Sequence, residues 1–92
     1  MPITYVHIEW PDHKTDKVYS PSSVIKEYFI AGENLSVKSF MDTCTKGLLK
    51  ANERVFQKFG FACTSALSES ERIHILCQKY DASKKVKIIS IT

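Results

Sequence analysis

The chain has 92 residues, of which 43% are hydrophobic and 25% charged, and its formal net charge is +3. We therefore expect one domain, residues 1–92, which is long enough to bury a core without disulfides or a structural metal. A charge this small does not indicate nucleic-acid binding. The three cysteines, Cys44, Cys63 and Cys77, lack paired spacing, which predicts a reducing, cytoplasmic location. With no signal-peptide pattern and no long apolar run, we expect no membrane association.

The N-terminal segment predicts a β-hairpin. Residues 3–10 alternate between apolar and other side chains, which is typical of a strand with one buried face. A turn at residues 11–14 follows, because proline and aspartate both favour turns, and residues 16–19 form the return strand.

A first helix is expected next, between Ser20 and Gly32. Ser20 is placed to cap it, Pro21 occupies its first turn, and Gly32 ends it. The amides and hydroxyls around Pro21 could also bind an anion, but ordinary capping explains the same residues.

The strongest helical periodicity spans residues 37–59. Ser36 is placed to cap this helix and Gly60 to end it, while Gly47 marks a bend or a close helix contact. A third helix runs from about residue 63 or 64 to 80, although a capping-box spacing at Ser68 would start it later. Residues 85–91 form a final strand rich in β-branched side chains.

This order, β-β-α-α-α-β, predicts an α+β fold with a small antiparallel or mixed sheet and helices packed on one face. Strict alternation places apolar side chains on the open face as well, and a face of this kind is rarely left in water. We therefore predict a homodimer, unless the C-terminal tail frays and no patch forms. The candidate interface residues are Ile3, Tyr5, His7, Ile89 and Ile91.

Cys63 is the weak candidate for catalysis. It lies near the predicted start of the third helix, where free amides and the helix dipole stabilise a thiolate. A catalytic role needs a positioned base, and no histidine lies near Cys63 in sequence; the alternative is a small, buried apolar residue. His74 and Cys77 lie one helical turn apart, but without a close pair of metal-binding knuckles we expect no metal and no cofactor.

Five short motifs occur in order along the chain: Met1-Pro2, Trp10-Pro11-Asp12, Tyr19-Ser20-Pro21-Ser22, Glu53-Arg54-Val55 and Phe59-Gly60-Phe61-Ala62-Cys63. Together they resemble a family of small bacterial nitrogen-starvation-response proteins. Genes of that family lie in clusters with an aliphatic nitrilase, a radical-SAM protein, an acetyltransferase and a flavoprotein. The family commonly has a glycine after Trp-Pro-Asp, where this chain has His13.

The resemblance implies a bacterial cytoplasm, nitrogen limitation and neighbours that handle nitrile or cyanide nitrogen, without an established activity. We therefore expect a non-catalytic accessory or regulatory binding protein that acts with nitrilase-cluster proteins. The alternatives are a small thiol-dependent enzyme or intermediate carrier that uses Cys63, and a weak nucleic-acid-binding regulator. The candidate binding residues matched to the family are Tyr19, Ser20, Pro21, Ser22, Arg54 and Cys63.

Overall fold

The computed structural model describes residues 3–92, so the Met1-Pro2 motif lies outside the described part of the chain. None of the described helices is long and apolar enough to cross a membrane. In chain order, the elements are β1 (Thr4–Glu9), β2 (Thr15–Ser20), the 3₁₀ helix η1 (Ser23–Glu27), β3 (Asn34–Ser36), α1 (Val37–Phe59), α2 (Thr64–Cys77) and β4 (Lys85–Ile91).

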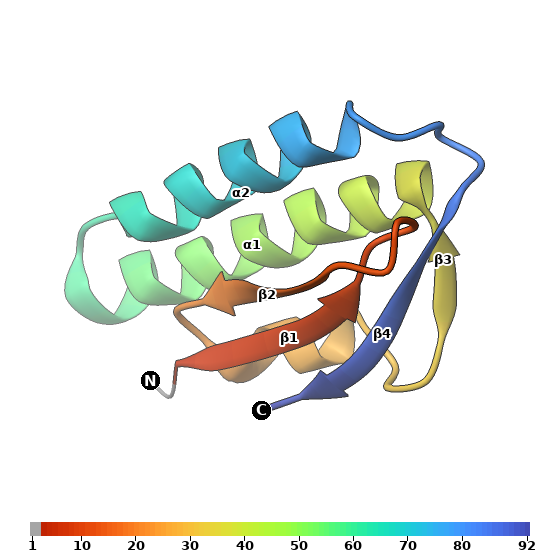
Figure 1. Ribbon diagram of the computed structural model, residues 1–92. Coiled ribbons are helices and arrows are strands. Elements are labelled where there is room, and N and C mark those ends of the chain that lie inside the picture. The colour runs from red at the N-terminus through yellow and green to blue at the C-terminus, as the bar shows by residue number, and fades with distance from the viewer. Residues whose placement is uncertain (1–2) are drawn as a thin grey trace.

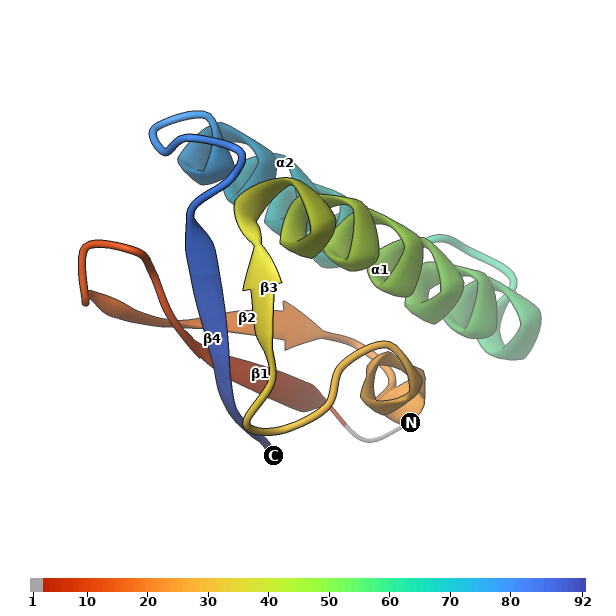
Figure 2. The same ribbon diagram turned by 90° about the vertical axis from the view of Figure 1, so that its right-hand side faces the viewer.

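The strands form one sheet in the order β2-β1-β4-β3, and every neighbouring pair is antiparallel. α1 and α2 lie side by side across one face of this sheet (Figures 1 and 2). The predicted α+β fold with helices on one face is therefore confirmed, and the sheet is of the antiparallel kind.

The core lies between the sheet and the helices. Six apolar residues at alternating positions of β1, β2 and β4, and directly after β1, are buried beneath the helices. They are Val6, Ile8, Trp10, Val18, Val86 and Ile88, and they pack against Ile25, Phe29, Val37, Phe40, Cys44, Leu48, Ile73 and Cys77.

The β1–β2 loop places His13 in the left-handed backbone region, with φ 70°. The Trp10 amide donates to the Lys14 carbonyl at 2.8 Å, and the His13 amide donates to the Trp10 carbonyl at 2.9 Å. This is the common hairpin loop in which a turn is followed by one left-handed residue, a position that favours glycine. His13 therefore adopts a backbone conformation that glycine would adopt without strain.

The expected helix from Ser20 to Gly32 is wrong in extent. Only Ser23–Glu27 is helical, and the cap is Ser22, whose side chain accepts from the Val24 amide at 3.3 Å. The Ser20 hydroxyl instead donates to the Ser22 carbonyl at 2.7 Å, so it stabilises the connection before the helix. Beyond η1 the chain turns into β3, with Gly32 at φ 89° donating its amide to the Ile88 carbonyl.

β4 contains an irregularity that changes which residues face the core. His7 pairs with Ser90, but Ile8 pairs with Ile88, so Ile89 is an extra residue opposite β1. Ile91 consequently lies opposite buried Val6 and packs against the core. The expectation that Ile91 lies on the open face is therefore wrong.

The two α-helices follow the sequence pattern closely. α1 has the predicted bounds, with Ser36 accepting from the Ser39 amide at 3.1 Å and Gly60 ending the helix at φ 79°. Gly47 marks a close contact with η1, because a Cβ there would lie 2.5 Å from Ile25 Cδ1. α2 begins at Thr64 rather than at the alternative start near Ser68, and ends at Cys77, before the expected residue 80.

Candidate functional site

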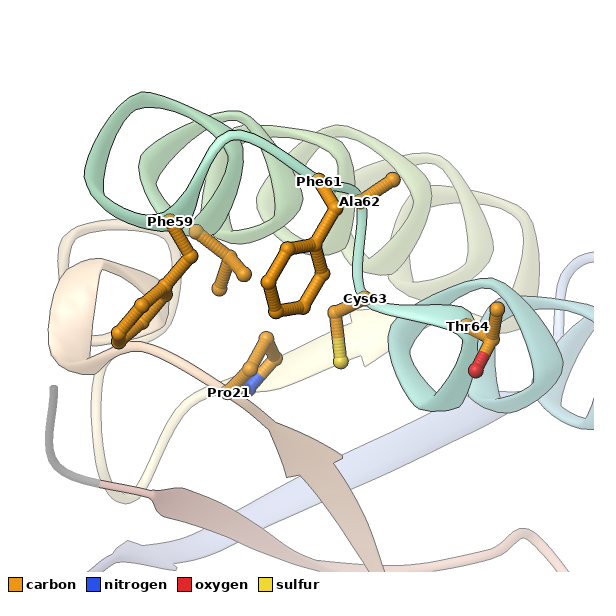
Figure 3. Close-up of a pocket in the computed structure, with 7 residues that line it drawn as sticks. Pro21, Phe59, Phe61, Ala62, Cys63 and Thr64 are labelled. Carbon is orange, nitrogen blue, oxygen red and sulfur yellow. The ribbon is translucent and has the colours of Figure 1, made fainter.

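An apolar hollow of about 500 Å³ opens beside the turn between α1 and α2. Three segments build it: the β2–η1 connection, the last turn of α1, and the residues that lead into α2. In Figure 3 the Phe61 ring and the sulfur of Cys63 point toward Pro21, and the Phe59 ring lies to one side of them. The lining residues are Pro21, Val55, Phe59, Phe61, Ala62, Cys63 and Thr64.

Two residues fix the turn that forms this hollow. Gly60 adopts the left-handed conformation that reverses the chain after α1. Asn52, buried on α1, accepts a hydrogen bond from the Cys63 amide through its side-chain oxygen. Sequence reasoning missed Asn52, although a single amide within the apolar stripe of α1 was a signal that it has a buried partner.

Aromatic rings stand exposed at the mouth of the hollow. Phe59 is 52% exposed and Phe61 is 63% exposed, and their ring centroids lie 6.0 Å apart. Lys58 Nζ lies 5.6 Å from the centroid of the Phe59 ring, within range of a cation–π contact. An apolar hollow with exposed rings at its mouth is suited to receive an apolar group from another molecule.

Cys63 is the half-buried thiol among three free cysteines, since Cys44 and Cys77 are both buried. Burial raises the pKa of Cys44 well above its ordinary value and raises the pKa of Cys77 to about 11. The Tyr19 hydroxyl lies beside the Cys63 thiol, and burial together with this neighbour raises the pKa of Tyr19. Among the described residues, no histidine lines the hollow, so Cys63 has no imidazole base there.

The structure brings together some of the predicted binding residues and separates others. Pro21 and Cys63 line the hollow, whereas Tyr19 lies beside Cys63 and lines a neighbouring pocket. Ser20 and Ser22 are buried in the adjoining connection, and their hydroxyls hydrogen-bond within that segment, which favours capping over anion binding. Arg54 is exposed on α1 and does not line the hollow.

Beyond Tyr19, a charged cluster joins α2 to the outer edge of β2. Arg72 donates to Asp16 at 2.9 Å, to Glu69 at 2.8 Å, and to the Lys17 carbonyl at 2.9 Å. Glu69 in turn accepts the Tyr19 amide at 2.7 Å. Sequence reasoning missed this cluster, because Asp16 and Arg72 are 56 positions apart and only the fold brings them together.

The electrostatics of this cluster follow from its hydrogen bonds. Burial alone would raise the pKa of Asp16, but the Arg72 guanidinium, the Lys17 amide and the Trp10 indole together hold it below its ordinary value. In turn, hydrogen bonds to the carboxylates of Glu69 and Asp16 raise the pKa of Arg72, and Glu69 contributes most. These charges are therefore already paired with one another, which is typical of a structural cluster.

Within residues 3–92, no group of three or more histidine, cysteine, aspartate or glutamate side chains is placed to hold a metal ion. No curated protein and no solved structure matches the chain. A family model does match it over residues 5–91, nearly its full length, and its description is nitrogen starvation-induced protein NitG. The chain therefore belongs to the family of nitrogen starvation-induced proteins NitG.

Proposed function

We propose that this nitrogen starvation-induced protein is a non-catalytic accessory protein that binds a partner through the hollow at the α1–α2 turn. The observation that supports this proposal is the apolar hollow of about 500 Å³ with Phe59 and Phe61 exposed at its mouth. Large apolar side chains are costly to leave in water, and exposed clusters of them mark contact surfaces.

The partner proposed is a product of the nitrilase gene cluster that the family resemblance implies. The experiment is an affinity pull-down of the tagged protein from nitrogen-starved host cells, read by mass spectrometry. Capture of a cluster protein that the Phe61→Ala variant loses would support the proposal. Ile75→Ala is the matched control, because Ile75 is 61% exposed on α2 and does not line the hollow.

Two outcomes count against this function. Recovery of the bait alone, from cells in which the cluster proteins are abundant, contradicts a stable accessory complex. Equal loss of capture in Phe61→Ala and Ile75→Ala shows that the hollow is not the contact surface.

A second candidate function is thiol chemistry at Cys63, favoured by the position of this half-buried thiol in the wall of the hollow beside Tyr19. Cys63→Ser separates the two functions, since serine is similar in shape to cysteine but lacks the nucleophilic thiolate. The binding function predicts that Cys63→Ser still captures the partner and still supports growth under nitrogen limitation. Normal capture without growth would favour the thiol.

A further inference from the structure

Four cations follow one another at four-residue intervals in α1: Lys46, Lys50, Arg54 and Lys58, here called the basic row. Lys46, Arg54 and Lys58 are exposed and Lys50 is half-buried. Within the described chain, only Lys50 of the four forms an ion pair, with Glu53 at 3.5 Å. The row therefore carries positive charge that the fold does not use internally.

The basic row leads to the hollow. A step of four residues turns an α-helix by about 40° beyond a full turn, so the row winds around α1 as it advances. Its last member, Lys58, reaches the Phe59 ring at the mouth of the hollow. The row spans about 18 Å at 1.5 Å per residue.

We propose that this surface binds an acidic segment of a partner protein, with one large apolar side chain of the segment in the hollow and its carboxylates along the basic row. The inference rests on the proposed binding function and adds the chemistry of the partner. Charge complementarity selects the sign of the segment, and the apolar lining selects the side chain that enters. A segment of about 12 residues, if helical, matches the length of the row.

The charges favour an acidic peptide over a single-stranded nucleic acid. A nucleic-acid track needs positive charge along a whole groove and several stacking faces. Here Glu53 interrupts the row beside Lys50, and the net charge of the chain is only +3. A symmetric contact between two copies at this patch is also disfavoured, because it brings basic row against basic row.

The test uses a fluorescein-labelled synthetic peptide with glutamate on one helical face and leucine and phenylalanine on the other. Fluorescence anisotropy measures its binding to the full chain at low salt. One comparison peptide has lysine at every glutamate position, another has alanine at every apolar position, and an oligothymidylate tests the nucleic-acid alternative. We expect the acidic amphipathic peptide alone to bind.

Protein variants then locate the surface. Arg54→Gln combined with Lys58→Gln is expected to lower the affinity for the acidic peptide by about tenfold, and Phe61→Ala is expected to lower it by a similar factor. Lys84→Gln combined with Lys87→Gln removes the same charge outside the row and is expected to change binding less than about twofold. Circular dichroism and urea unfolding check that each variant is folded.

Several results overturn the inference: no binding of the acidic peptide, equal weakening by both double variants, or tighter binding of the oligothymidylate. Its failure is distinct from that of the proposed function. If the pull-down partner is lost with Phe61→Ala but kept with Arg54→Gln/Lys58→Gln, the hollow binds a partner and the acidic-segment inference is wrong.

Discussion

His13 holds the hairpin loop in a conformation that its side chain disfavours. A non-glycine residue in the left-handed region costs roughly 1–2 kcal/mol, although histidine tolerates it better than most. Its Nδ1 atom lies 3.7 Å from a Glu9 carboxylate oxygen, and this contact is solvent-exposed and contributes little.

We predict that His13→Gly raises the free energy of unfolding by about 0.5 kcal/mol, the relief of strain less the larger entropy of an unfolded glycine. Urea denaturation measures it. His13→Ala is the control, since alanine keeps the strain and is expected to give no gain. A lower free energy of unfolding for His13→Gly would contradict the backbone strain at His13.

The three cysteines differ in exposure, and this predicts a simple labelling pattern. Cys44 and Cys77 are buried with raised thiol pKa values, whereas Cys63 is half-buried. Because the thiolate is the reactive form, iodoacetamide at mildly alkaline pH is expected to add one group to the native protein and three after unfolding. Intact mass spectrometry counts the adducts, and native Cys63→Ser is the control that should stay unlabelled. Two adducts on the native wild type would contradict the burial of Cys44 or Cys77.

The contact between α2 and β2 depends on the Arg72 cluster. Arg72→Ala removes hydrogen bonds to Asp16, Glu69 and the Lys17 carbonyl. Because the guanidinium is partly exposed, we expect a loss of about 1–2 kcal/mol in the free energy of unfolding at neutral pH. Arg54→Ala, on the exposed side of α1, is the matched control and should change it by less than about 0.5 kcal/mol.

The stabilising effect of the Arg72 cluster depends on pH through Asp16. Its pKa is lowered in the folded state, so its stabilising effect is present above the ordinary aspartate pKa and is lost as the pH falls through the folded value. The difference between wild type and Arg72→Ala should therefore shrink below about pH 4. A difference that stays constant from neutral to acid pH would show that Asp16 is not coupled to Arg72.

The sequence predicted the elements that local signals define. α1 has its predicted bounds because a cap, a glycine and a long apolar period all agree at Ser36 and Gly60. β3 gave no signal, since three residues are too short to show alternation and become a strand only by pairing with β4. The extra residue at Ile89 also has no local signature, yet it reverses the facing of Ile91.

The candidate residues Tyr19, Pro21 and Cys63 were selected by the resemblance of their motifs to the family and not by a local structural signal. The fold places two of these residues, Pro21 and Cys63, in the wall of the hollow, and it places Tyr19 beside Cys63 in a neighbouring pocket. The roles of Asn52 and Arg72 depend on partners distant in sequence, which one sequence without its fold does not reveal.

At the scale of the whole molecule, the homodimer stays a prediction, and the apolar surface proposed as its interface is smaller than the sequence pattern indicated. With Ile91 turned to the core, Ile3 and Ile89 are the exposed apolar residues among the described candidate interface residues. Lys17 also lies over the Tyr5 ring, at 4.6 Å from its centroid, and puts charge next to this candidate interface residue.

Equilibrium ultracentrifugation at micromolar concentration tests the dimer. We expect a dimer that Ile89→Lys weakens, because the variant places a charge within the contact. Ile75→Lys is the control, since Ile75 is exposed on α2, away from the sheet. A strict monomer for the wild type would remove the dimer.

The Arg72 cluster has a consequence for colloidal behaviour. β2 is an edge strand of the sheet, and an edge strand with free amides and carbonyls can pair with a strand of another chain. Here Glu69 takes the Tyr19 amide and Arg72 the Lys17 carbonyl, so a helix supplies the hydrogen bonds that a fifth strand would make. The opposite edge strand, β3, is only three residues long. Both edge strands are therefore poor templates for further strands, and we expect acid, which neutralises the carboxylates bound to Arg72, to expose the β2 edge.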